Sequence, residues 1–461
     1  MMVAWGRAKT ILRLALPTAF ALVIQNVMSL VSIAMVGHLG DAAVAGIGVA
    51  GTVFSMLLAV LFGLDTGVQA VVARRAGAGE LHRAGGTLND ALLISALAGL
   101  LLAAVAWVAG PCVLAMIVDD PAVITHGTRY LTALCPMLLF TGVNFAFSAW
   151  WNGAGVPKRS LLVILIQLPF NILFSYVLIF GAFGLPRLDT LGAGLGITLA
   201  ALVGLAVHAV LASRIAPIPG FLRRAPTWAG VAMLLRIGLP VSVQQFLLYV
   251  GLAIYFAIVA RLGTREVAAV NVMGALMLLS IFTATGLGIA AATLVGQALG
   301  RNDAADAKRR GWEAGWVGAL VIVPLSLVTL AAPRSTLGLF IIDDATIALA
   351  VTPLRLLALS MCIDTFGRVL AFALRGAGAT QVQAMVAFGL QWCVQLPLCW
   401  YVGVSLGHGL EGIALVRLLL YAVEAAILGF IWHRGRWSRV RLSGQDSAPA
   451  RASISAENSG R

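Results

Sequence analysis

Long apolar stretches alternate with short polar segments from one end of the chain to the other. Each stretch has about 20 residues or more, enough for an α-helix to cross a hydrocarbon core about 30 Å thick. A membrane β-barrel would instead show segments of about ten residues in which apolar and polar positions alternate. The pattern predicts an all-α integral membrane protein with twelve transmembrane helices, at about 14–36, 44–73, 91–118, 128–151, 161–181, 192–213, 238–260, 267–298, 314–338, 347–374, 383–403 and 412–432.

The composition agrees with this class. Apolar residues fill 61% of the 461 positions and charged residues 11%, and the mean hydropathy is +0.98, whereas a soluble protein carries about 25% charged residues. The five cysteines lack metal-ligand spacing. The tripeptide DTG at 65–67 is shared with aspartic proteases but occurs once, and that chemistry needs two carboxylates. We therefore expect no cofactor and no enzymatic activity.

The net charge of +13 is explained by where the basic residues lie. If the N-terminus is cytoplasmic, the segments on that side hold most of the 31 Lys and Arg residues, as the positive-inside rule requires. The prediction is a multi-pass protein of the bacterial inner membrane with both termini in the cytoplasm, and no nucleic-acid partner is needed. Up to the last span, the cytoplasmic segments contain Arg7, Lys9, Arg13, Arg74, Arg75, Arg83, Lys158, Arg159, Arg214, Arg223, Arg224, Arg236, Arg301, Lys308, Arg309, Arg310 and Arg375.

The chain overlays itself when it is shifted by 223 positions: LRLALP at 12–17 meets LRIGLP at 235–240. Because the copies start six spans apart, an even number, both enter the membrane in the same direction, as in transporters built from parallel repeats. Two such six-helix lobes enclose a central cleft, and rocking the lobes would open it to either side in turn. We expect an N-lobe at 1–213, a cytoplasmic linker at 214–236, a C-lobe at 237–432 and a disordered cytoplasmic tail at 433–461.

Several motifs, in matching order and spacing, resemble the multidrug and toxic compound extrusion (MATE) family. They are MVGHLGDAAVAGIG after span 1, VVARRAGAGE after span 2, PFNILFSYVLIFG in span 5, ARLGTREVAAVNV entering span 8 and LRGAG after span 10. The resemblance covers about residues 10–432. It implies a secondary active antiporter that expels cationic or amphipathic drugs and xenobiotics in exchange for H⁺ or Na⁺.

The resemblance transfers to some site positions and not to others. Members of one bacterial subtype keep an acid in span 10, eleven positions before the Arg of LRG, and that position here is Asp364. Many members carry an Asp in span 1, three positions before MVG, where this chain has Ser32. Asn171 stands where the family often has an Asn in span 5, and Ser175 where some members have an acid. Coupling through an N-lobe acid of the span 1 type is therefore not expected.

Asp364 and Arg368 lie one turn apart on one face of an apolar span. At 1.5 Å per residue, Asp364 lies about 16 Å from Arg375, near the middle of the membrane. An intramembrane carboxylate is costly and usually functional. Asp364 is thus a candidate for ion coupling, by a proton or by a transient Na⁺. Arg368, and Asn171 in span 5, are predicted neighbours of the coupling residues. The alternative is a permanent Asp364–Arg368 pair that orders the C-lobe.

Asp65 lies at a similar depth, about 14 Å from Arg74 by the same count. It is a candidate cation contact or second coupling acid, and the alternative is a structural hydrogen bond. Ser32, Gln25 and Asn26 in span 1, with Gln244 and Gln245 in span 7, are candidate cleft or substrate contacts, although such side chains often bond neighbouring helices instead.

Two further expectations complete the sequence prediction. Arg417 and Glu424, two turns apart in span 12, should form structural pairs. Within transport, the alternative to drug efflux is a flippase for lipid-linked saccharides with a related two-lobe build. Such a protein would need a strongly basic central cavity, whereas the candidate cleft residues here are acidic or neutral. The choice between H⁺ and Na⁺ stays open.

Overall fold

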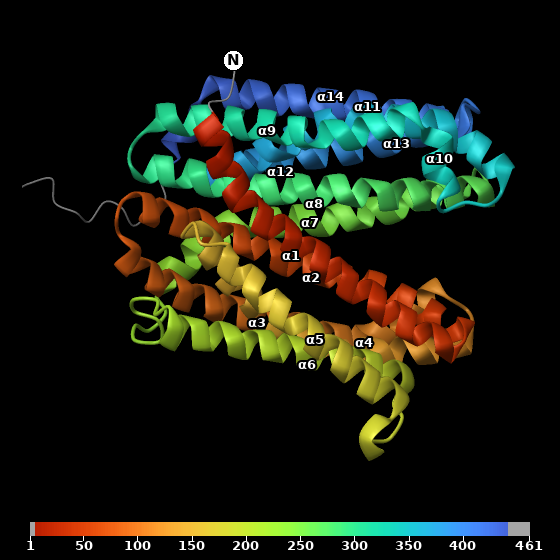
Figure 1. The fold of residues 1–461 in the computed structure, drawn as a ribbon, viewed down its shortest axis with the longest axis horizontal. Helices are drawn as coiled ribbons and strands as arrows, with labels where there is room; N and C mark the ends of the chain where they lie inside the picture. The colour runs from red at the N-terminus through yellow and green to blue at the C-terminus, as the bar shows by residue number, and fades with distance from the viewer. Residues whose placement is uncertain (1–4, 441–461) are drawn as a thin grey trace, which may run out of the picture.

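The computed structural model describes residues 5–440, and the described chain is helical throughout (Figure 1). The long helices begin and end close to charged residues, prolines and glycines. They are α1 Trp5–Val36, α2 Asp41–Gly77, α3 Leu81–Ile117, α4 Pro121–Gly153, α5 Lys158–Phe180, α6 Asp189–Val210, α7 Trp228–Ala260, α8 Thr264–Gly300, α9 Ala304–Ala331, α11 Asp344–Gly376 and α14 Gly409–Arg434. Three short α-helices complete the described set, α10 Pro333–Gly338, α12 Thr380–Phe388 and α13 Leu396–Trp400.

Within residues 5–440, twelve helical segments are long and apolar enough to cross a membrane, which agrees with the predicted number. The ninth differs from its predicted bounds of 314–338, because α9 ends at Ala331 and a separate short helix starts at Pro333. A proline has no backbone N–H and disfavours helical geometry in the residue before it, so the chain breaks there. The eleventh segment runs from Thr380 to Ser405 and combines α12 and α13 with two π-helical stretches.

Both lobes are built on the same plan. In the first lobe α4 packs against α2, α3 and α6; in the second lobe α11 packs against α8, α9 and α14. The first helix of each lobe also reaches into the other lobe. Ile11 of α1 is buried in a C-lobe cluster, and Leu234 of α7 is buried in the N-lobe cluster. Figure 1 shows α1 running from the upper lobe down across the lower one.

Glycines make paired contacts across the seam, the surface along which the two lobes meet, and these contacts show how the lobes are related. Gly63 packs against the backbone of Ser242, and Gly286 packs against Ala19. Gly77 packs against Gln297, and Gly300 against Arg74, so closely that neither glycine has room for a Cβ. Gly63 and Gly286 are 223 positions apart, as are Ala19 and Ser242, so the second contact repeats the first with the lobes exchanged. The contacts of Gly77 and Gly300 are related in the same way. The two halves are therefore related by a pseudo-two-fold axis and have the same orientation, as predicted for a parallel repeat.

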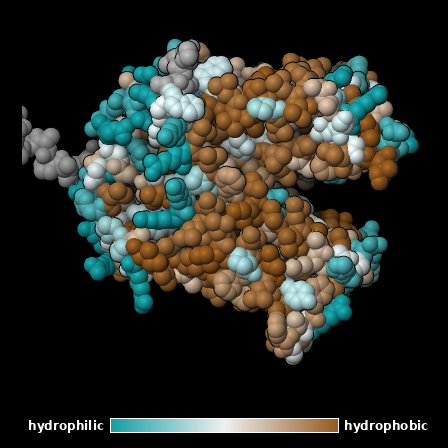
Figure 2. Space-filling model, in the orientation of Figure 1, coloured by the Kyte–Doolittle hydropathy of each residue, from teal (hydrophilic) through white to brown (hydrophobic). Residues whose placement is uncertain are grey.

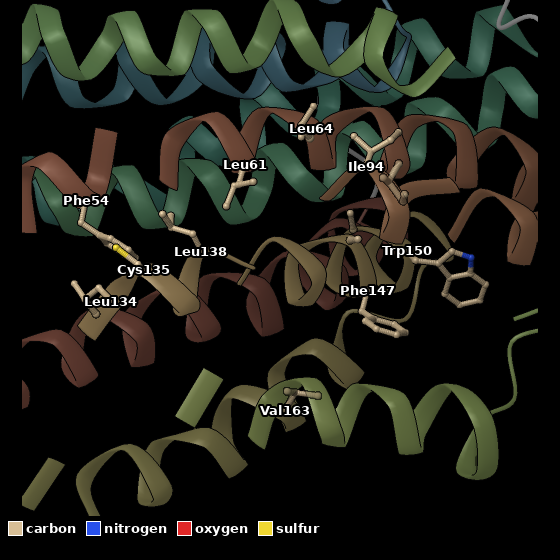
Figure 3. Packing of buried hydrophobic residues seen from close by; sticks show 14 of the residues in the cluster. Phe54, Leu61, Leu64, Ile94, Leu134, Cys135, Leu138, Phe147, Trp150 and Val163 are labelled. Atoms are coloured by element: carbon tan, nitrogen blue, oxygen red, sulfur yellow. The ribbon is translucent and has the colours of Figure 1, made fainter. Parts of the chain in front are cut away.

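A dense apolar core holds each lobe together, because packing rather than the hydrophobic effect joins helices in lipid. Figure 3 shows the N-lobe core, where Phe54 and Leu61 of α2 meet Leu134 and Leu138 of α4. Large rings close this core near the end that contains the N-terminus: Trp150 and Trp151 stack edge to face with ring centroids 4.8 Å apart. The C-lobe is filled by two clusters of its own.

The surface separates into an apolar belt and two hydrophilic ends (Figure 2). Between the lobes the surface is hollowed into a cleft, which opens at the end opposite the N-terminus. At the other end the seam is closed by α2 and α8, whose backbones meet at Gly77 and Gly300. The predicted central cleft is therefore open at one end only. Where disorder was expected from residue 433, α14 continues to Arg434 and a 3₁₀ turn follows at Arg436–Arg439; residues 441–461 of that predicted tail lie outside the described residues.

Candidate cleft and buried polar sites

Asp364 and Arg368 form the ion pair that their spacing predicts. Arg368 Nε donates a hydrogen bond of 3.0 Å to Asp364 Oδ2 within α11. The Asp364 side chain is 4% exposed and that of Arg368 is 31% exposed, so the carboxylate is enclosed and the guanidinium reaches outward. Glu424 of α14 lies within electrostatic range of both. The carboxylate in this span therefore already has a cationic partner.

Arg375 at the end of α11 is held by neutral partners. Arg375 donates to Gln383 Oε1 at 3.1 Å and to Gln244 Oε1 at 3.3 Å, which ties α11 to α12 and α7. The amide oxygen of Gln244, a predicted cleft contact, is thus engaged within the protein. Gln245 is half-buried and has no hydrogen bond through its side chain among residues 5–440.

The expectation of structural pairs for Arg417 and Glu424 is wrong in its partners. Arg417 donates to the hydroxyls of Tyr421 at 2.6 Å and Tyr255 at 3.4 Å, and its guanidinium lies over both rings. Glu424 forms no ion pair within the described part of the chain. Two tyrosines offer both a hydroxyl acceptor and a ring face to one guanidinium, so they replace the expected carboxylate.

Asp65 lies on α2 of the N-lobe, in a different setting from Asp364. Its Oδ1 atom is enclosed and has no hydrogen-bond partner anywhere in 5–440. One turn further along the same face, Gln69 Nε2 donates to the carbonyl oxygen of Ile289 at 2.8 Å and to Thr293 Oγ1 at 3.0 Å, both in α8. Asp65 therefore lies one turn from a bond that joins the lobes, with unused acceptor capacity.

Two buried polar residues near the middle of α5, Asn171 and Ser175, also lack partners within the described chain. Asn171 is 1% exposed, and neither its amide nitrogen nor its amide oxygen has a partner in the described chain. Ser175, one turn on, is fully buried, and its hydroxyl likewise has none. Buried polar groups in native proteins nearly always have a partner, including ordered water. Asn171, a predicted neighbour of the coupling site, lies in the same lobe as Asp65 and in a different lobe from Asp364.

The predicted cleft contacts on α1 differ in how far their side chains are exposed. Ser32 is 5% exposed and donates to the carbonyl oxygen of Met28 in its own helix at 3.0 Å. Gln25 is exposed and Asn26 is half-buried, and the described residues supply no hydrogen bond to either side chain. Only the last two therefore have free polar groups at an accessible surface.

Sequence reasoning missed the residues that close the seam. Arg74, counted only as a cytoplasmic charge, is buried and donates to the carbonyl oxygens of Val440 at 2.8 Å and Ala377 at 2.9 Å in the other lobe. Its repeat counterpart Gln297 donates to the carbonyl oxygen of Gly153 at 3.4 Å. The internal repeat was the available signal, since Arg74 and Gln297 are 223 positions apart and both precede the closing glycines.

Two like-oriented bundles of six helices, with a cleft open at one end, define a membrane transporter of the two-lobe class. The chain belongs to the MatE family, whose model matches residues 17–177 and 240–401, one match in each lobe.

The chain is similar to two curated proteins, each called "Probable multidrug resistance protein NorM". The one from Bradyrhizobium diazoefficiens is 30% identical over 87% of this chain and 88% of its own length. The one from Thermotoga maritima is 23% identical over 94% of this chain and 93% of its own. A solved structure described as the outward-facing conformation of a multidrug resistance MATE family transporter superimposes with a TM-score of 0.85 at 20% identity, covering 94% of this chain and 96% of that one.

Proposed function

We propose that the protein is a secondary active antiporter that expels cationic or amphipathic drugs in exchange for H⁺ or Na⁺ by alternating access. The observation that carries this proposal is the cleft between two like-oriented lobes, open at one end and sealed at the other by contacts that the repeat makes symmetric. Membership of the MatE family and the names of the two curated relatives support it over a saccharide flippase.

The acids proposed to couple ion and drug movement are Asp65 and Asp364, and they would act differently. Asp65 has a free acceptor atom beside the seam, so it can take a proton or a cation without breaking an existing bond. Asp364 is bonded to Arg368, so a proton or Na⁺ at Asp364 competes with that guanidinium. Protonation of Asp364 would free Arg368 to change partners, which links ion binding to the packing of α11 against α14.

We further propose that the closed, basic end faces the cytoplasm of a bacterial inner membrane, with both termini on that side. This orientation follows the positive-inside rule, because the basic segments at the helix ends gather there. In that orientation the structure corresponds to the outward-open state of the transport cycle. Drug would be released from the cleft of this state, and the coupling ion would enter through it.

Efflux of a cationic dye from proteoliposomes tests the proposal. The purified full-length chain is reconstituted, ethidium is provided on the side of the basic end, and a pH gradient and a Na⁺ gradient are imposed in separate runs. We expect one of the gradients to drive dye movement, and an ionophore that collapses that gradient should stop it. Dye movement that neither gradient accelerates over protein-free liposomes would refute ion-coupled efflux.

A further inference from the structure

A cavity of about 470 Å³ lies at the basic end of the C-lobe, away from the cleft. Its walls come from three places: the start of α7, the turn between α11 and α12, and the end of α14 with the 3₁₀ turn that follows. None of the residues with a predicted or proposed transport role lines it. The cavity is therefore separate from the proposed drug path.

Three arginines surround this cavity: Arg236 of α7, Arg434 of α14 and Arg436 of the 3₁₀ turn. All three side chains are exposed, and within 5–440 none of them forms an ion pair. Among the described residues that line the cavity there is no Asp or Glu. Three guanidinium groups that converge without a carboxylate repel one another, and their forked donors match the oxygens of a phosphate.

The remaining walls of the cavity are apolar and continue onto the lipid-facing flank. Phe430 and Val382 line the cavity and are exposed. The guanidinium of Arg434 lies over the Phe430 ring, 4.4 Å from its centroid. Leu239, one turn from Arg236 on α7, and Met385, one turn from Val382 on α12, extend the exposed apolar surface into the spans. A free anion would need the arginines alone, whereas a lipid uses both surfaces.

We propose that this cavity binds an anionic phospholipid. The phosphate of the headgroup lies among Arg236, Arg434 and Arg436, and an acyl chain follows the flank formed by α7 and α12. The arginines lie where two spans begin and end, which is the level of the lipid headgroups. Basic pockets between helices at this level are a general physical solution for holding acidic headgroups. This inference rests on the fold and does not depend on drug transport.

Native mass spectrometry of the full-length protein tests the proposal, with phosphatidylglycerol, phosphatidylcholine and inorganic phosphate as separate probes. The wild type should retain phosphatidylglycerol in preference to the other two. Arg236→Gln and Arg436→Gln should each weaken this binding about fivefold, and the triple variant R236Q/R434Q/R436Q about 100-fold, since each basic residue near an anionic surface contributes about 1 kcal/mol. The single variants keep the test valid if the triple variant does not fold.

The matched control is R214Q/R223Q/R224Q, which removes the same charge from exposed arginines of the linker. It should bind phosphatidylglycerol within about twofold of the wild type, because those side chains lie outside the cavity. Equal losses in the control and the cavity variants would overturn the proposal in favour of general surface attraction. Full displacement of the lipid by inorganic phosphate would overturn it in favour of a small-anion site.

Discussion

The two lobes share one backbone plan but differ in the setting of their candidate coupling acids. In the C-lobe, Asp364 has Arg368, and Arg375 has two glutamines. In the N-lobe, Asp65 has an enclosed oxygen without a partner, and Asn171 has two such atoms among the described residues. The repeat relates helices, not these side chains. Asp364 is therefore already compensated by a cation, while Asp65 and Asn171 offer free capacity for a proton, a water molecule or a cation.

The largest expected effect comes from breaking the compensated pair. Asp364→Asn keeps the size of the side chain but removes the charge that Arg368 needs, so gradient-driven dye efflux should fall to the level of protein-free liposomes. The variant should still insert, since the helix stays apolar. Asp119→Asn, an exposed acid between α3 and α4, is the control and should leave efflux unchanged. Full activity in Asp364→Asn would assign the pair a purely structural role.

The seam provides a second comparison between equivalent positions. Arg74→Gln removes two charge-assisted bonds to carbonyl oxygens and should lower the free energy of unfolding by about 2–4 kcal/mol. Gln297→Ala, at the repeat-related position, removes one long bond and should cost less than about 1 kcal/mol. Thermal unfolding of the detergent-solubilised protein measures both. Similar costs for the two variants would mean that the closed end is held by backbone packing alone.

Asp65→Asn and Asp364→Asn should differ in their effect on the free energy of unfolding. Because Asp65 has an unpartnered oxygen, its replacement should change the free energy of unfolding by less than about 0.5 kcal/mol, whereas Asp364→Asn should cost about 1–2 kcal/mol. The pH dependence of dye efflux should change in Asp65→Asn if this acid takes part in coupling. Should resistance and pH dependence both stay at wild-type values, Asp65 has only a structural role.

The smallest effects are expected at two buried serines. Ser175→Ala removes a hydroxyl that has no partner among residues 5–440, so the unfolding temperature should stay the same or rise slightly. Ser32→Ala removes a hydroxyl that bonds its own helix, and the change should be within about 0.5 kcal/mol. A clear loss of stability in Ser175→Ala would indicate an ordered water molecule at this hydroxyl, and the contrast between the lobes would weaken.

Much of the fold could be predicted because it depends on patterns within single segments. Hydrophobic length determines the number of spans, and the described part of the chain has twelve. The shift of 223 predicts like orientation, and the glycine contacts at Gly77 and Gly300 follow it. The break at Pro333 was missed, because the apolar run continues beyond this proline and predicts one span over 314–338.

The candidate site was less predictable, because partners in space come from distant segments. The Asp364–Arg368 pair could be predicted, since both residues lie on one helix four positions apart. The pairing of Arg417 with Tyr255 joins residues 162 positions apart, and no spacing within span 12 could reveal it. Arg74 looked like an exposed cytoplasmic charge until the structure placed the carbonyl oxygens of the other lobe beside it.

By itself the sequence determined the membrane class, the count of spans, the duplication and the one pair that lies within a helix. Each of these depends on hydrophobic run length, on repetition or on the 3.6-residue turn, all of which act locally along the chain. Only the tertiary structure decided which buried polar groups have partners, how the lobes close at one end, and that Arg236 lines the same cavity as Arg434 and Arg436. These outcomes depend on which helices pack together, because a hydrogen bond or an ion pair acts over a few ångströms in space, whatever the distance along the chain.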